Sequence, residues 1–275
     1  MSVLLTTADS LLHLGAAVAY AAVFILLLFS AVLGKRTLRS AAFTGAVGLG
    51  LHLCAIAGRW VAVGHGPVVT KYENLSSYAL VTAAVALYLL LRKRSLGQIG
   101  LVLYPTSFLL IGLALYSGPV VENLPPTFTG VWLVLHVCFY FLAFGTAVTA
   151  VGASALLLVR GRLRSATVGR LPDSAELDAM SYRYAGLGFA FWGVGMLTGA
   201  IWAFNAWGRY WAWDPVETWS LITWLSFGIY LHLRRFFAWE GCRAAWLILG
   251  TFVFALMSLF GTTLIDGSLH SVYFR

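Results

Sequence analysis

Long apolar runs, separated by short charged loops, set the limits on what this sequence can fold into. The runs cover about residues 11–33, 41–63, 75–91, 99–116, 130–159, 184–204, 216–233 and 244–264. Each is close to the roughly 20 residues that a helix needs to cross a bilayer. Because 60% of the residues are hydrophobic and 10% are charged, lipid rather than water must surround them. The prediction is an all-α, polytopic transmembrane bundle of about eight spans, forming a single integral membrane domain over residues 1–275.

The cationic residues fall mainly on one side of these predicted spans. Fourteen of the eighteen Lys and Arg residues lie on the side reached after the odd-numbered runs, and only Arg59, Lys71, Arg209 and Arg275 lie on the other. The positive-inside rule makes the first side cytoplasmic. Both termini are then expected on the outer, extracytoplasmic side. Topology accounts for the net charge of +8, so nucleic acid is not an expected partner.

Two loop features bear on architecture and chemistry. The polar segment 174–183, SAELDAMSYR, is predicted to lie as a separate surface helix. Cys54, Cys138 and Cys242 are far apart, and no C-x-x-C pair occurs, which argues against thiol–disulfide chemistry and a structural zinc site. The sequence also lacks C-x-x-C-H, so the chain is not itself a c-type cytochrome.

Residues 205–224 form a tryptophan-rich stretch, NAWGRYWAWDPVETWSLITW, whose loop 205–219 is predicted to face outward. It contains Trp207, Trp211, Trp213 and Trp219. Tryptophans at span ends usually form an interfacial belt, whereas several in one short loop favour a flat surface for a flat ligand. Asp214, before Pro215, is predicted chiefly to cap the next helix, with Glu217 in its first turn.

Four histidines form two candidate sets. His136, at the outer end of the fifth run, and His270, after the eighth, fall on the same side as the tryptophans. His52 and His232 lie within the second and seventh runs. They match in depth if the seventh helix extends below the membrane, which the RRFFAW segment after residue 233 favours, or if the second run begins deeper. A lone histidine is more often a hydrogen-bonded polar residue. However, paired neutral imidazoles on facing helices are a usual way to hold haem iron from both sides.

Arg59, one turn from the outer end of the second run, has three possible roles. It can extend to the membrane surface, pair with Glu73, or pair with a haem propionate.

These motifs resemble the tryptophan-rich WWD signature of the haem-handling proteins of cytochrome c biogenesis. The segment WDPVETWSLITWLSFGIYLHLR is similar to the CcsA branch, also called CcsB or ResC, of the system II machinery. LHLCAIAGRWVAVGHGPVVTKYENLSSY, VWLVLHVCFYFLAFG and GTTLIDGSLHSVYF resemble further segments of that family. The resemblance extends from about the second run to the end.

The resemblance implies a haem-handling role. It implies haem b binding in the membrane through His52 and His232, and at an external site through His136 and His270, which serve as axial iron ligands. Haem would then be attached through thioethers to an apocytochrome c bearing C-x-x-C-H. Trp207, Trp211, Trp213, Asp214, Trp219 and Arg59 are the further haem-contacting residues expected.

The implied partners are a separate ResB-type membrane subunit, because the chain carries no ResB-like domain, and a thioredoxin-like thiol-reducing protein. A bacterial cytoplasmic membrane is the expected location, ahead of a thylakoid-type membrane. Whether this chain alone is a lyase stays open. Two alternatives also stay open: a CcmC-type haem delivery protein without attachment activity, and a non-haem membrane scaffold or transporter.

Overall fold

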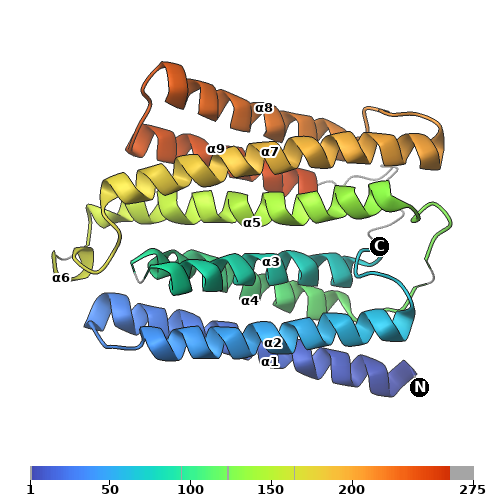
Figure 1. Ribbon diagram of the computed structural model, residues 1–275, viewed down its shortest axis with the longest axis horizontal. Coiled ribbons are helices and arrows are strands. Elements are labelled where there is room, and N and C mark those ends of the chain that lie inside the picture. Colours follow the sequence, from blue (N-terminus) through green and yellow to red (C-terminus); the bar gives the residue numbers. More distant parts are fainter. Residues whose placement is uncertain (1, 94, 123, 164, 261–275) are drawn as a thin grey trace. The chain divides into compact units, whose positions relative to one another are not determined.

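The computed structural model describes residues 2–93, 95–122, 124–163 and 165–260, with side chains from Thr7 onward and without that of Ser165. The described residues form helices and connecting loops, with no strand (Figure 1). They group into two compact units: residues 1–123 with 159–176, and residues 124–158 with 177–275. We call these unit 1 and unit 2.

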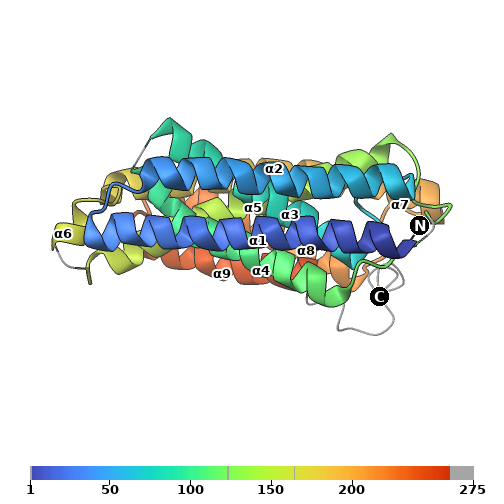
Figure 2. The ribbon, with the colours of Figure 1, turned by 90° about the horizontal axis from the view of Figure 1, so that it is seen from below.

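Unit 1 is built from the N-terminal helices. They are α1 (Ser2–Leu33), α2 (Leu38–Val63), α3 (Lys71–Arg92), the 3-10 helix η1 (Leu96–Ile99), α4 (Gly100–Ser117) and the short α6 (Ser165–Val168). Helices α1 and α2 lie side by side (Figure 2). A Cβ at Gly48 would lie 2.8 Å from the Cβ of Ala19, so a small residue allows this close approach, as is usual between membrane helices.

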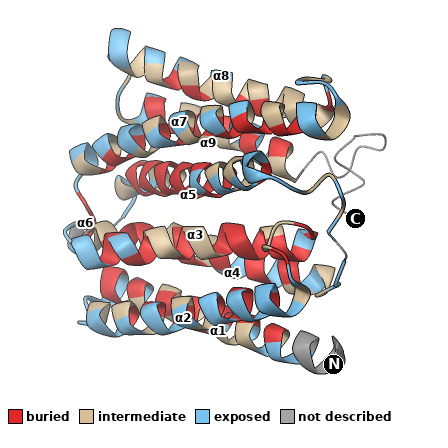
Figure 3. Ribbon diagram, turned by 45° about the vertical axis from the view of Figure 1, so that its right-hand side comes forward, coloured by how far each residue is buried: buried red, intermediate tan, exposed pale blue. Residues whose placement is uncertain are grey.

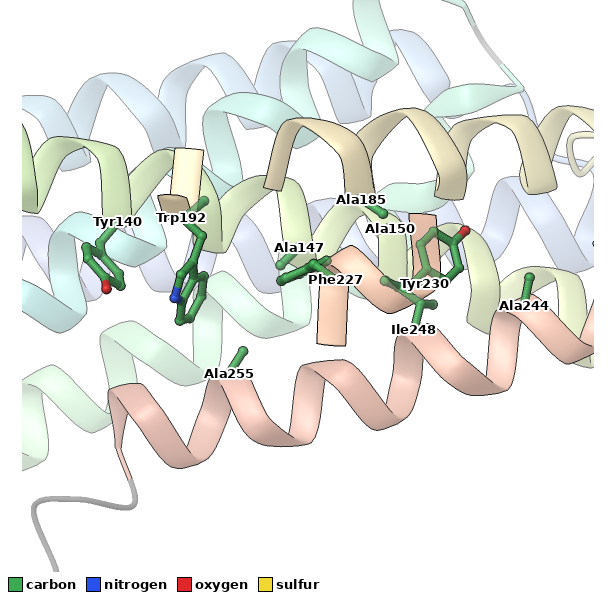
Figure 4. Close-up of a cluster of buried hydrophobic side chains, with 11 residues drawn as sticks. Tyr140, Ala147, Ala150, Ala185, Trp192, Phe227, Tyr230, Ala244, Ile248 and Ala255 are labelled. Carbon is green, nitrogen blue, oxygen red and sulfur yellow. The ribbon is translucent and has the colours of Figure 1, made fainter. Parts of the chain in front are cut away.

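Unit 2 contains α5 (Val131–Arg160), α7 (Ser174–Trp207), α8 (Pro215–Phe236) and α9 (Cys242–Leu259), apart from the α5 and α7 ends that belong to unit 1. Tyr140, Trp192, Phe227 and Tyr230 fill its core, with alanines between them (Figure 4). Trp192 Nε1 donates to Ser220 Oγ at 2.8 Å, and the Tyr140 hydroxyl bonds to the same oxygen. These polar atoms of the core are therefore satisfied, and their hydrogen bonds connect α5, α7 and α8.

The prediction of a polytopic helical membrane protein is confirmed. Seven helical segments among the described residues are long and apolar enough to cross a membrane. Large apolar side chains such as Phe43, Val61 and Leu197 are exposed on them, and Figure 3 shows exposed strips along the helices. Lipid can cover such strips, because every backbone polar group inside a helix is already bonded.

The seventh of the eight predicted spans, residues 216–233, lies in α8, which has 22 residues. That length spans a bilayer at 1.5 Å per residue. However, α8 is not among the seven segments that meet the apolar standard, because its polar and tryptophan residues lower its hydropathy.

The expected surface helix at residues 174–183 is wrong as a separate element. These residues are the first turns of α7, a continuous helix of 34 residues. Asp173 accepts a hydrogen bond from the Glu176 N–H at 2.7 Å and so caps the start. Arg234 of α8 then holds Asp178 through two hydrogen bonds, of 2.7 and 2.6 Å. Because this polar segment has a partner on α8, it continues into α7 and does not form an element of its own.

Candidate functional site

His136 is held against α7 near the start of α5. Its Nδ1 lies 2.8 Å from the carbonyl oxygen of Gly195, and its ring is half-buried. A carbonyl can only accept, so Nδ1 carries the proton in this contact. A histidine that ligates a metal usually makes such a hydrogen bond through its other nitrogen.

A glycine makes room for this imidazole. A Cβ built at Gly199 would lie 2.3 Å from His136 Nδ1, closer than two such atoms can approach. The ring of Trp202 lies nearly parallel to that of His136, with centroids 6.1 Å apart and an interplanar angle of 19°. Trp202 in turn contacts Trp207 edge to face at 4.9 Å. The structure therefore connects His136 to the tryptophan-rich loop through Trp202.

The tryptophan-rich loop begins where α7 ends at Trp207. Gly208 has φ +74°, and its N–H bonds to the carbonyl of Phe204 at 2.8 Å, a left-handed ending that glycine adopts without strain. Trp213 also has a positive φ, of 56°, and 70% of its surface is exposed. A bulky residue in this conformation is strained, so neighbouring contacts must hold it.

Asp214 caps α8, as predicted. Its Oδ1 accepts from the Val216 N–H at 2.9 Å, and Asp214 and Glu217 together form a capping box with Pro215 at the first helical positions. Trp219 stacks on Phe254 of α9, with centroids 6.1 Å apart. Trp211 meets Trp213 edge to face at 5.8 Å. The four predicted tryptophans thus lie in or directly beside one loop of unit 2.

His232 lies in a second place within unit 2. It is exposed and lines an open groove between α7 and α8, with a volume of about 520 Å³. The groove is lined by Tyr182, Arg183, Gly186, Leu231, His232, Arg235 and Phe236. Helix α8 continues to Phe236, beyond residue 233 where the predicted run ends, and the depth match with His52 stays a prediction. A groove of this size with aromatic walls can hold a cofactor-sized ligand.

His52 belongs to unit 1, where it is fully buried. Its Nδ1 bonds to the Tyr20 hydroxyl at 3.2 Å and its Nε2 to Ser76 Oγ at 2.9 Å. His13 Nε2 lies 2.7 Å from the same Ser76 Oγ. Ligation of haem iron by His52 would require one of its two hydrogen bonds to break. Since His52 and His232 belong to different units, their pairing stays a prediction.

Arg59 is bound by carboxylates in unit 1. Its Nε donates to Glu73 Oε1 at 2.8 Å and its Nη1 to Asp9 Oδ2 at 3.3 Å, and all three side chains are buried. Of the roles considered for Arg59, pairing with Glu73 is confirmed. A contact with haem stays a prediction, and His270 lies outside the described residues.

Sequence analysis did not anticipate several residues of these sites. His13 is one of them, although its spacing of seven from Tyr20 puts both on one helix face. Trp202, Arg183 and Arg235 had no local signal, since only the packing of α7 against other helices makes them relevant.

The arrangement defines a multi-pass membrane protein with histidine sites and a tryptophan-rich loop. Residues 68–270 match the family described as cytochrome c assembly protein. The sequence is 36% identical to the cytochrome c biogenesis protein CcsA of Chlamydomonas reinhardtii over 226 residues, which is 78% of this chain and 63% of that protein. It is 34% identical to the CcsA of a Prochlorococcus marinus strain, over 78% of this chain and 76% of that protein. The CcsA of Chlorella vulgaris is 32% identical, with 86% of this chain and 87% of that protein covered.

The chain belongs to the cytochrome c assembly protein family, and its relatives include CcsA proteins. It spans less than two thirds of the length of the Chlamydomonas relative. Among solved structures, it resembles the cytochrome c haem lyase CcmF with a TM-score of 0.69 at 17% identity, covering 98% of this chain and 47% of that one. This likeness concerns the fold.

Proposed function

We propose that this chain handles haem in the membrane as a subunit of a system II cytochrome c synthase. The observation that carries the proposal is the setting of His136. The Gly195 carbonyl fixes Nδ1 as a donor, which supports Nε2 as the nitrogen that would ligate iron. Trp202 lies nearly parallel to the imidazole and contacts the tryptophan-rich loop. His270 is the proposed second axial ligand.

Haem b is the substrate, and its vinyl groups supply the reactive bonds. Each thiol S–H of the apocytochrome adds across one vinyl C=C, giving a C–S and a C–H bond. In this proposal His136 and His270 fix the position of the iron, and Trp207, Trp211, Trp213 and Trp219 form the wall beside the ring. Asp214 and Glu217 hold the loop that carries this wall. The chain contributes proximity and orientation.

The groove at His232 is the proposed inner haem site. Its volume of about 520 Å³ falls within the range of ligand pockets, and its imidazole is exposed to it. Tyr182 and Phe236 supply aromatic walls. We propose His232 as an iron ligand at this site, with His52 as the partner that the family resemblance implies.

The proposed location is a bacterial cytoplasmic membrane, with both termini and the tryptophan-rich loop on the outer side. The bias of Lys and Arg residues supports this orientation. The proposed partners are a ResB-type subunit and an apocytochrome with a C-x-x-C-H motif, with a thioredoxin-like protein to keep its thiols reduced. Attachment outside the cytoplasm suits this arrangement.

The test is cytochrome maturation in cells that depend on this chain. A double His136→Ala, His270→Ala variant is expected to lose covalent haem attachment while still reaching the membrane. His65→Ala is the matched control, because His65 is a histidine in an outer loop whose ring bonds to the Gly66 and Glu122 carbonyls. Retained maturation in the double variant would overturn the external site.

A further inference from the structure

Three arginines lie at the end of α8 or on the facing turn of α7, and one of them is already paired. Arg234 makes two hydrogen bonds to Asp178 and lies over the Tyr182 ring, 5.1 Å from its centroid. Asp178 also accepts from the Gly241 N–H at 2.9 Å. Since a two-point arginine–carboxylate pair is strong and geometrically fixed, Arg234 serves the packing of unit 2.

Arg183 and Arg235 differ from Arg234 in this respect. Both are exposed and line the groove, and neither takes part in the ion pairs found among the described side chains. The groove lining includes no acidic residue. Two positive charges therefore border a groove that also exposes His232.

The spacing of the groove residues allows them to contact one ligand. Arg235 follows His232 by three positions, so both project from one face of α8. Gly186 follows Arg183 by three on α7, and a Cβ built there would meet only Leu231, at 4.0 Å. The absence of a side chain at Gly186 thus leaves the groove open beside the imidazole.

We propose that Arg183 and Arg235 bind the two propionate groups of the haem that His232 ligates. This assignment rests on the haem-handling function proposed above. Arginine is suited to carboxylates because its planar fork donates two parallel hydrogen bonds. Tyr182, Phe236 and Leu231 would then hold the apolar macrocycle, for which Gly186 leaves space, and Arg183 and Arg235 would hold the propionates.

Lipid phosphate is the other source of anionic oxygens at such a place. Phosphate recognition, however, needs neither the imidazole nor the space at Gly186. A propionate-bearing haem uses the imidazole, the space at Gly186 and both arginines together. Haem dimethyl ester distinguishes haem binding from lipid binding because it keeps the ring and lacks the charges.

The experiment uses the full chain with His136→Ala, so that haem absorbance reports the inner site. Haem and haem dimethyl ester are titrated separately into the detergent-purified protein. The parent is expected to bind haem about 10-fold or more tightly than the ester, because two charge-assisted interactions are lost with the ester. The double variant Arg183→Gln, Arg235→Gln should bind both equally. Arg243→Gln is the control, since Arg243 is an exposed arginine outside the groove lining.

A preference for haem that survives in the double variant would overturn the proposal. If that preference survives and the double variant also retains less phosphatidylglycerol, the arginines bind lipid and the proposal is overturned as well. Gly186→Leu should weaken binding of both haem and ester about 10-fold or more with unchanged helix content, and unaltered binding would count against the groove. Failure of the proposed inner site is recognised separately, because His232→Ala would then leave the haem spectrum of the parent unchanged.

Discussion

Glu217 fixes the backbone on both sides of Trp213. Its Oε2 accepts hydrogen bonds from the N–H groups of Ala212, at 2.8 Å, and Asp214, at 3.2 Å. Between these two anchored residues, Trp213 adopts φ 56° with 70% of its surface exposed. A strained and exposed tryptophan, held by a carboxylate of the next helix, points to a role in contacting a ligand.

Glu217→Ala should loosen the loop. The variant loses two hydrogen bonds to a charged acceptor, of which the one from the Asp214 N–H is half of the capping box, and this loss costs about 1–3 kcal/mol. We expect a lower Tm and a shift in tryptophan fluorescence, both rescued by Glu217→Gln, because glutamine can also form the box. Glu122→Ala, an exposed acid in unit 1, is the control. An unchanged Tm and fluorescence in Glu217→Ala would contradict the role given to the carboxylate.

Trp213→Gly should separate stability from function. Glycine adopts a positive φ without the strain of about 1–3 kcal/mol that a bulky residue carries, and an exposed ring adds little to folding. The Tm is expected to stay or rise while cytochrome maturation falls about 10-fold or more. Trp246→Ala serves as control, since Trp246 is 64% exposed on α9. Full maturation by Trp213→Gly would show that the ring has no role.

Gly199→Ala should displace the His136 imidazole. The added Cβ would lie 2.3 Å from Nδ1, so the ring must move and its bond to Gly195 must lengthen or break. Alanine favours a helix by about 1 kcal/mol over glycine, so the fold should persist while haem affinity at the external site drops about 10-fold or more. Gly250→Ala is the matched control because nothing lies within 4 Å of its added Cβ. Equal haem affinity in both variants would argue against the position assigned to His136.

Arg59→Met should destabilise unit 1. The change leaves the buried carboxylates of Asp9 and Glu73 without their cation, and removing one partner of a buried ion pair costs about 3–5 kcal/mol. Denaturation in detergent would measure this loss, with the exposed Arg39→Met as control. If instead stability is unchanged and haem binding is lost, Arg59 contacts haem rather than serving the fold.

The features that the sequence predicted correctly are local. The apolar runs place the helices, because bilayer thickness sets their length, and the Asp214–Pro215–Glu217 cap follows from three neighbouring residues. The helix extension beyond His232 was also foreseen from the residues that follow it.

Features that depend on residues far apart in sequence were missed. Asp178 and Arg234 are 56 positions apart, and their pairing makes segment 174–183 part of α7 instead of a surface helix. Similarly, His13 of α1 and His52 of α2 both bond to the hydroxyl of Ser76 on α3. Such convergence depends on how helices pack, which charge and hydropathy patterns do not encode.

The absorption spectrum of the purified, haem-loaded chain tests the central claim most directly. We predict the spectrum of a haem with two histidine ligands, which weakens in His136→Ala, weakens in His232→Ala and disappears when both are changed. A spectrum that is unchanged in the double variant, or a protein that binds no haem, would contradict the account.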